Sequence, residues 1–249
     1  HLVLRLEAPL MAFGDVMVDS IGPVRATPAA STVTGLLANA LGVRRWEPVR
    51  LARLQARLVF GCRLDRRGRR FTEFQTAQLS KDDVGWTTRG RIEGRKGGPD
   101  TYRSPHIRRR DHDADACVTV ALRLLDSDEP PTLGDLARAL DEPARPLFLG
   151  RKHCLPSGRL VVGLLDAPTV HDALLAAPLP GSGGTTTLRR TDTRMLVVVP
   201  ADDPCPEGFR PVRATERRDW TAGIHTGELL TYHGHVARER LLEAPSEGA

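Results

Sequence analysis

The chain has 249 residues, of which 40% are hydrophobic and 27% are charged, so it is long enough to bury a core and we do not expect disorder. No apolar run approaches the roughly 18 residues that a membrane span needs, and no basic-then-apolar leader opens the sequence. We therefore expect a cytoplasmic protein with no membrane partner. The four cysteines form no CxxC pair, which predicts neither a zinc site nor a disulfide framework, and no cofactor is indicated.

Positive charge is concentrated in one quarter of the chain. Residues 44–110 contain 19 Lys or Arg against 7 Asp or Glu, whereas the rest of the chain contains 17 against 24. A basic segment of this kind attracts polyanions, so nucleic acid is the first partner to consider. The alternative is that many of these arginines only solvate the surface.

The amino-terminal part predicts a strand, a loop and a helix. Residues 2–6 are short, apolar and stopped by Pro9, which is typical of a strand. A stretch rich in glycine and proline follows. Ser31 is placed to cap a helix over residues 31–43, with Gly42 as its stop signal.

The next segment predicts a β-hairpin and then a long excursion. Apolar side chains recur at every second position in residues 51–64, namely Leu54, Ala56, Leu58 and Phe60. Together with residues 68–79 they predict a hairpin around the DRRGRR turn. Over residues 79–115 apolar content is almost lost while arginine and glycine accumulate, so this segment cannot build a core. We expect a protruding hairpin or a mobile loop there.

Order returns after the excursion. Residues 116–125 predict a central strand, Thr132 is placed to cap a short helix, and residues 160–165 predict another strand. With one strand pair doubled, this order is the split βαβ arrangement of ferredoxin-like folds. We therefore predict an α+β fold with a ferredoxin-like domain over residues 1–165 and a smaller β-rich subdomain over residues 166–249.

Residues 148–154 read FLGRKHC and allow three interpretations: a nucleophilic site, half of a metal site, or a loop that grips a phosphate. The grip is favoured, because Gly150 lets the backbone approach a ligand, Arg151 can fork onto a phosphate and Lys152 adds a charge. The alternative is that Gly150 only closes a turn and both cations are solvated. Cys154 is more often a small buried residue than a nucleophile.

Two further chemistries receive weaker support from the sequence. Four residues at the end of the excursion could be metal ligands: Asp111, His112, Asp113 and Asp115. Alternating short acidic residues more often organise a turn, so we expect no metal. A metal-free ribonuclease needs His, Lys and Tyr side chains around one phosphate, and the candidates are Tyr102, His106, Lys152 and His153. Nothing in their spacing shows that they converge.

Four motifs resemble one known family when they are taken in order. They are the opening LVLRLEAPLMAFG, the pattern P-x-x-S-x-x-x-G-L-L-A-N-A-L-G from Pro28 to Gly42, the strand ADACVTVAL and the FLGRKHC loop. In this order and spacing the chain resembles the CasD family, the fifth Cas family of subunits in type I-E CRISPR Cascade surveillance complexes, within the RAMP superfamily. The resemblance covers residues 2–165 well and the carboxyl-terminal part only loosely.

The resemblance implies an RRM-like (ferredoxin-like) domain with a long basic β-hairpin thumb, here residues 79–115. Such subunits hold the 5′ handle of the CRISPR RNA and cap a filament of backbone subunits, next to the large subunit that reads the protospacer-adjacent motif. Target DNA is then met only through the complex, because base pairing to the guide reads its sequence.

The resemblance also implies that the chain is not an enzyme, because a separate endonuclease cleaves the precursor RNA in type I-E systems. The alternative is a metal-independent endoribonuclease that processes precursor CRISPR RNA, as a related branch does in type I-C systems.

The expected RNA-binding residues fall into three groups. The group near the first helix contains Gly14, Arg25, Ser31 and Gly35. The group on the thumb contains Lys81, Arg89, Arg91, Arg103, Arg108 and Arg109. The group in the FLGRKHC loop contains Gly150, Arg151 and Lys152. The expected thumb contains only Trp86 and Tyr102 as aromatic residues, so we expect it to bind phosphates more than it stacks bases.

Overall fold

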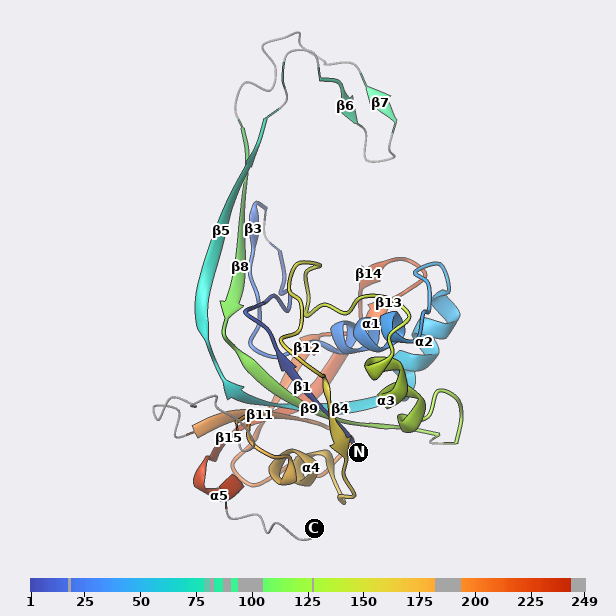
Figure 1. Cartoon of the computed structure of the whole chain (residues 1–249), viewed down its shortest axis with the longest axis vertical. Coiled ribbons are helices and arrows are strands. Elements are labelled where there is room, and N and C mark those ends of the chain that lie inside the picture. The colour runs from blue at the N-terminus through green and yellow to red at the C-terminus, as the bar shows by residue number, and fades with distance from the viewer. Residues whose placement is uncertain are drawn as a thin grey trace.

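The computed structural model describes residues 1–17, 19–78, 80, 83–86, 91–93, 105–126, 128–181 and 194–242, and its architecture is shown in Figure 1. Its body is an antiparallel sheet whose strands are β1 (Leu2–Glu7), β4 (Leu58–Arg66), β9 (Cys117–Leu124), β10 (Val161–Leu164), β11 (Arg194–Pro200), β12 (Arg210–Thr215) and β15 (Glu228–Ala237). Within the described residues, the order across this seven-stranded sheet is β10-β1-β9-β4-β11-β15-β12.

Four of these strands form the ferredoxin-like part. Their order is β10-β1-β9-β4, and each neighbouring pair is antiparallel. The helices α1 (Ala30–Ala40) and α2 (Pro48–Arg57) come between β1 and β4 in the chain, and α3 (Leu133–Asp141) comes between β9 and β10. This is the split βαβ arrangement. The predicted α+β, ferredoxin-like fold is therefore confirmed.

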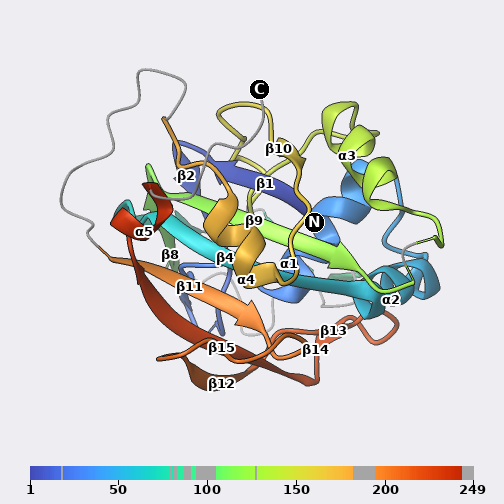
Figure 2. The ribbon, with the colours of Figure 1, turned by 90° about the horizontal axis from the view of Figure 1, so that it is seen from below.

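Both faces of the central strands of the sheet are buried, which explains the continuous apolar runs in β1, β4, β9 and β11. Along β1, Leu2 and Leu4 face a core that includes residues of α1 and α3, whereas Val3 faces a second core with α4 (Val170–Ala176). All three side chains are fully buried. Figure 2 shows α4 crossing one face of the sheet, with α1, α2 and α3 on the other face.

The strands after residue 165 continue the same sheet. β11 pairs with β4 through Val197 and Val198, β15 pairs with β11, and β12 lies at the edge. The short elements β13 (Arg218–Asp219), β14 (Ile224–His225) and α5 (Glu239–Leu242) complete this part. The division of the chain at residue 165 stays a prediction, but the strands on its two sides share one sheet. No helix in the described ranges has the length and apolar composition to cross a lipid bilayer.

A buried arginine fastens α4 to the sheet. The Arg63 side chain is fully buried on β4, where its Nε donates to Oδ1 of Asp65 at 2.5 Å. Its Nη1 donates to the carbonyl oxygens of Leu174 and Ala177 at the end of α4, the second at 2.9 Å. These bonds satisfy a charge that would otherwise be very unfavourable in the interior.

A second sheet is built around the ribbon, which we define as β5 (Arg69–Ala77) paired with β8 (His106–Ala114). Two short strands flank the lower part of β8, namely β2 (Leu10–Met11) and β3 (Ile21–Gly22). Figure 1 shows the ribbon rising far beyond the body, with the pair β6 (Gly85–Trp86) and β7 (Ile92–Glu93) near its far end.

The hairpin predicted between residues 51–64 and 68–79 is wrong. β4 lies between β9 and β11, so both of its edges are occupied, and β5 pairs with β8 along its whole length. Gly68 permits the change of direction, because its φ is +70° and a Cβ there would lie 2.3 Å from the carbonyl oxygen of Ala114. The ribbon therefore begins at Arg69, earlier than the expected start of the thumb at residue 79.

The strand that the period-two pattern predicts over residues 51–64 is wrong for the first half of this segment. Residues up to 57 form α2, with Pro48 at its start. Leu51, Leu54 and Arg57 recur at helical spacing and are all buried, whereas Ala56, which the strand pattern placed with Leu54, is exposed.

The two predicted helix caps have different outcomes. Thr132 caps α3 as expected, because its hydroxyl accepts from the backbone N–H of Asp135 at 3.2 Å. Ser31 does not cap α1, since the N-cap is Ala29 and Ser31 lies inside the helix. The Ser31 N–H instead donates to the carbonyl oxygen of Glu216, 3.1 Å away, so the carboxyl-terminal part supplies the partner.

Candidate nucleic-acid interface

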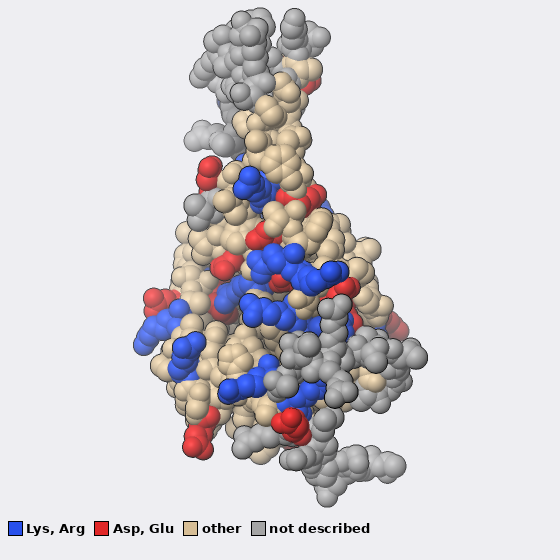
Figure 3. Space-filling view, turned by 90° about the vertical axis from the view of Figure 1, so that its left-hand side faces the viewer, with Lys and Arg blue, Asp and Glu red and all other residues tan. Residues whose placement is uncertain are grey.

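The ribbon exposes a row of arginines on β8. Arg108, Arg109 and Arg110 are consecutive and all three are exposed. The row is held by β3, which pairs with β8 in parallel, and by the Arg109 N–H, which donates to the carbonyl oxygen of Ser20 at 2.9 Å. Figure 3 shows Lys and Arg side chains gathered on this side of the molecule, from the lower ribbon across the body.

Alternation along β8 separates the acidic residues from His112. Neighbouring side chains of a strand point to opposite faces, so Asp111 and Asp113 share one face and His112 lies on the other. Arg70 pairs with both carboxylates, at 2.9 Å from Asp113 and 3.2 Å from Asp111. The four residues considered as metal ligands at the sequence level are therefore dispersed, and two of them hold Arg70 instead.

Gly150 brings the 148–154 loop against the chain that follows β2. The N–H of Ala12 donates to the carbonyl oxygen of Leu149 at 3.1 Å. The φ of Gly150 is +97°, and a Cβ at this position would lie 1.9 Å from the carbonyl oxygen of Ala12. Only glycine fits here. The close approach predicted for Gly150 exists, but its partner in this structure is the protein's own backbone.

Arg151 fastens the same loop to the ribbon. Its Nη1 donates to the carbonyl oxygen of Asp111 at 2.8 Å, and its Nη2 donates to that of Gly22 at 3.3 Å. The guanidinium is half-buried, and this burial lowers its pKa. The predicted fork onto a phosphate is thus occupied by protein carbonyls. Lys152 is exposed and is the cation of this loop that faces solvent.

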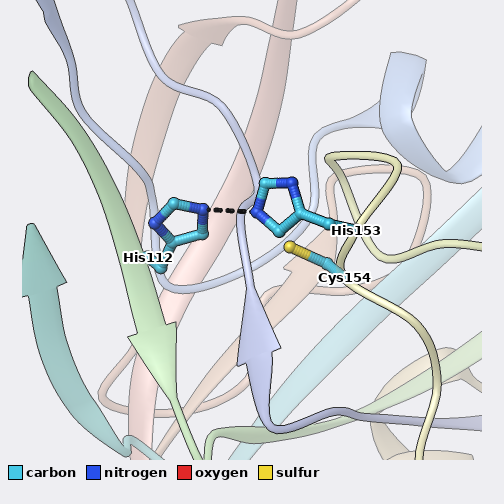
Figure 4. Close-up of side chains that lie close together, drawn as sticks. All are labelled: His112, His153 and Cys154. Atoms are coloured by element: carbon cyan, nitrogen blue, oxygen red, sulfur yellow. Dashed lines mark hydrogen bonds between the residues drawn. The ribbon is translucent and has the colours of Figure 1, made fainter. Parts of the chain in front are cut away.

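His112 and His153 meet between the ribbon and the loop, as Figure 4 shows. Their Nε2 atoms are 2.8 Å apart, and Nε2 of His112 is also 3.0 Å from Nη1 of Arg151. Because arginine can only donate, Nε2 of His112 must accept, and His153 then donates to it. Burial lowers the pKa of His112, with smaller effects from Arg151 and His153 in the same direction. His112 is therefore held neutral beside an exposed His153.

The predicted RNA contacts near α1 mostly face the protein. Nη2 of Arg25 lies 2.5 Å from Oε1 of Glu216, and these side chains are 21% and 7% exposed. Ser31 is buried, and Gly35 is half-buried in the middle of α1. Gly14 is exposed, and it forms an isolated antiparallel β-bridge with Val24. Of these four predicted residues, only Gly14 is open to solvent.

The predicted thumb residues are exposed wherever the structure describes them. Arg108 and Arg109 lie on the ribbon, and Nη1 of Arg108 donates to the carbonyl oxygen of Asp19 at 3.3 Å. Arg91, next to β7, is also exposed. Three further predicted residues lie outside the described part of the chain: Lys81, Arg89 and Arg103.

Sequence reasoning missed the aromatic side chains of the ribbon. Phe71 and Phe74 are 49% and 57% exposed on β5. Both lie in residues 68–79, which the sequence predicts as the second strand of a β-hairpin, before the expected start of the thumb at residue 79. Arg69 and Arg70, directly before Phe71, are the signal that could have indicated an exposed strand.

The ribonuclease candidates that the structure describes do not gather around one point. His106 and His112 are at opposite ends of β8, which at about 3.4 Å per residue separates them by roughly 20 Å. His153 contacts His112, which was not among the candidates, and so lies far from His106. Tyr102 lies outside the described residues.

Known proteins are similar to this chain in sequence. The model of a family described as CRISPR-associated protein (Cas_Cas5) matches residues 1–231. The chain is 27% identical over 182 residues to CRISPR system Cascade subunit CasD of Escherichia coli (strain K12), covering 70% of this chain and 75% of that protein.

Two solved structures are similar over nearly the whole chain. One is a chain of a CRISPR RNA-guided surveillance complex, with a TM-score of 0.65 and 25% identity over 95% of this chain and 89% of that chain. The other, described as the crystal structure of a Cas protein, has a TM-score of 0.60 and 25% identity over 96% of each chain. The resemblance that the four motifs indicated is confirmed, and the chain belongs to the Cas5 family of CRISPR-associated proteins.

Proposed function

We propose that the chain is a non-catalytic RNA-binding subunit of a type I-E Cascade surveillance complex. In this role it holds the 5′ handle of the CRISPR RNA and caps the filament of backbone subunits beside the large subunit. Membership of such a complex is supported by the name of the Escherichia coli relative and by the similar chain from a CRISPR RNA-guided surveillance complex. The observation that carries the RNA-binding part is the exposed arginine row of β8 beside the exposed Lys152.

The ribbon suits the backbone of a single strand better than a base sequence. Arg108 and Arg110 point to one face of β8 and Arg109 to the other, so both faces can meet phosphates. Contacts to phosphates position RNA without reading its sequence, which a subunit serving many guides requires. Phe71 and Phe74 also lie on opposite faces and can stack on splayed bases.

The test is to co-express the chain with its backbone subunits and a repeat-spacer transcript, purify the assembly and sequence the 5′ ends of retained RNA. We expect a uniform short handle derived from the repeat. Arg108→Ala combined with Arg110→Ala should lose it, whereas Arg138→Ala, which changes an exposed arginine on α3, should keep it. Equal retention by the double variant would contradict RNA binding by the ribbon, and failure to co-purify with the backbone subunits would contradict membership.

Arg151 gives a second test, because it holds the loop against the ribbon rather than facing solvent. Arg151→Ala should release Lys152 from its position and weaken RNA retention to the same extent for all guide sequences. RNA that stays bound equally tightly at every salt concentration would contradict a grip on phosphates.

A metal-independent endoribonuclease is the second candidate, and the His112 and His153 pair is the observation that favours it. Two imidazoles can supply the base and the acid that a 2′-hydroxyl attack on a phosphate requires once their mutual hydrogen bond is broken, and Lys152 is adjacent to His153 in the chain. Incubation with repeat RNA in the presence of a chelator decides between the two. We expect intact RNA, and cleavage that is lost in His153→Ala would favour the nuclease.

A further inference from the structure

We propose that His112, His153 and Cys154 form a binding site for a zinc-like divalent transition metal. The ligand atoms of these three side chains all lie within 4.8 Å of one another, although the first is on β8 and the other two are in the 148–154 loop. Figure 4 shows the two imidazoles facing each other, with the sulfur close to them. The proposal rests on this geometry and not on the proposed function, although the site lies in the loop that also contains Arg151 and Lys152.

The three ligand types select the metal. Imidazole nitrogen and thiolate sulfur are the donors that zinc and cobalt prefer, whereas magnesium and calcium prefer oxygen. His112 and Cys154 are each 1% exposed, and His153 is exposed. The two buried ligands therefore form the floor, and the exposed one provides a route for entry. A three-ligand site also leaves a fourth position open for water or for another ligand.

Backbone hydrogen bonds fix the position of Cys154 in the loop. The Cys154 N–H donates to the carbonyl oxygen of Arg151 at 2.9 Å, and the Cys154 carbonyl accepts from the Leu149 N–H at 2.7 Å. The backbone of Cys154 is therefore fixed, whereas its side chain and the exposed His153 can adjust when a metal enters.

The movement required of the two imidazoles is small. Zinc binds nitrogen at about 2.0–2.1 Å and sulfur at about 2.3 Å, so two nitrogen ligands in a tetrahedron are about 3.4 Å apart. The Nε2 atoms of His112 and His153 are 2.8 Å apart and must separate by roughly half an ångström. On binding, Nε2 of His153 gives up its proton, which the ring can carry on Nδ1, and the thiol of Cys154 releases its proton to solvent.

Arg151 opposes the metal and limits its affinity. Its Nη1 is 3.0 Å from Nε2 of His112, so an entering cation must displace this hydrogen bond and lies near a positive charge. The thiolate of Cys154 contributes one negative charge to the site, and Glu73 on β5 is close enough to act on His112. Burial raises the pKa of the Cys154 thiol, so the metal must also drive its deprotonation. We therefore expect a moderate affinity rather than that of a structural zinc site.

Cobalt is the probe that tests the site, because a thiolate bound to Co²⁺ gives a near-ultraviolet charge-transfer band. Untagged protein is titrated with Co²⁺ and then with Zn²⁺. We expect one Co²⁺ per chain with this band, and its loss when Zn²⁺ displaces the cobalt. Cys154→Ser should abolish the band, and His153→Ala, which changes an exposed side chain, should weaken binding at least about tenfold.

Matched controls separate this site from other thiols and imidazoles. Cys205→Ser removes an exposed thiol, and His106→Ala removes an exposed imidazole at the far end of β8. Both variants should bind Co²⁺ like the wild type. Thermal unfolding without metal should show that His153→Ala is folded. A band that survives Cys154→Ser, a band lost only in Cys205→Ser, or no band at a large excess of Co²⁺ would each overturn the proposal.

Discussion

The central sheet and the ribbon are both antiparallel and both contain long strands, but a fully buried arginine side chain lies in the sheet, whereas the arginine side chains of the ribbon are exposed. Arg63, on β4, is fully buried and makes its bonds to Asp65 and to carbonyls at the end of α4. Arg108 and Arg110, on β8, are exposed. Arg63 therefore stabilises the fold, whereas Arg108 and Arg110 are available to a partner. The 148–154 loop lies where the two regions join.

Removing a buried arginine should give the largest effect on stability. Arg63→Ala leaves the Asp65 carboxylate buried without its partner, so we expect the free energy of unfolding to fall by about 3–5 kcal/mol. Arg110→Ala on the ribbon should change it by no more than about 0.5 kcal/mol. Urea unfolding followed by circular dichroism measures both. Comparable losses for the two variants would remove the distinction between sheet and ribbon.

A substitution where the 148–154 loop meets residue 12 should destabilise the fold nearly as much. Gly150→Ala places a Cβ against the carbonyl oxygen of Ala12 at a positive φ, so we expect a loss of at least about 2 kcal/mol. Gly14→Ala is the matched control, because no atom lies within 4 Å of a Cβ there. The same urea unfolding experiment applies. An unchanged midpoint for Gly150→Ala would show that the loop does not need its contact with residue 12.

Replacing an exposed arginine of the ribbon should weaken RNA binding and leave the stability of the fold unchanged. Arg109→Ala should leave the unfolding midpoint unchanged and reduce the slope of log affinity against log salt by about 1, since one phosphate contact is lost. The loss should be the same for different guide sequences. Arg138→Ala is the control, and a filter-binding titration of the assembled complex at several salt concentrations is the measurement. An unaltered slope would place Arg109 outside the RNA path.

The smallest effect should be a pH dependence that arises where ribbon and loop meet. Burial lowers the pKa of His112 below its ordinary value, so between the two values the unfolded chain binds more protons than the folded one. Stability from this group should therefore fall as the pH falls through about 6.5. Unfolding midpoints of wild type and His112→Gln, measured from about pH 7.5 to about pH 5.5, should converge on acidification. The exposed His106→Gln should follow the wild type, and parallel curves for all three would contradict the assignment.

Local patterns predicted the elements whose residues interact with near neighbours in the chain. The apolar run of β1, the β-branched run of β9 and the capping of α3 by Thr132 all follow from a few adjacent residues. The family was also predictable, because its motifs keep their order and spacing in the chain. The prediction over residues 51–64 was wrong because alternate and helical spacing overlap at Leu54 and Leu58, and tertiary packing selected the helix for the first half.

The sequence alone therefore determined the ferredoxin-like core, the concentration of basic charge and the position of the FLGRKHC loop. Tertiary structure decided that β5 leaves the core to pair with β8, that Arg151 binds carbonyls of β3 and β8, and that His112 meets His153 and Cys154. The physical reason is that these contacts join residues about 40 or more positions apart in the chain or depend on which strand edges are already occupied. No local propensity encodes such a pairing.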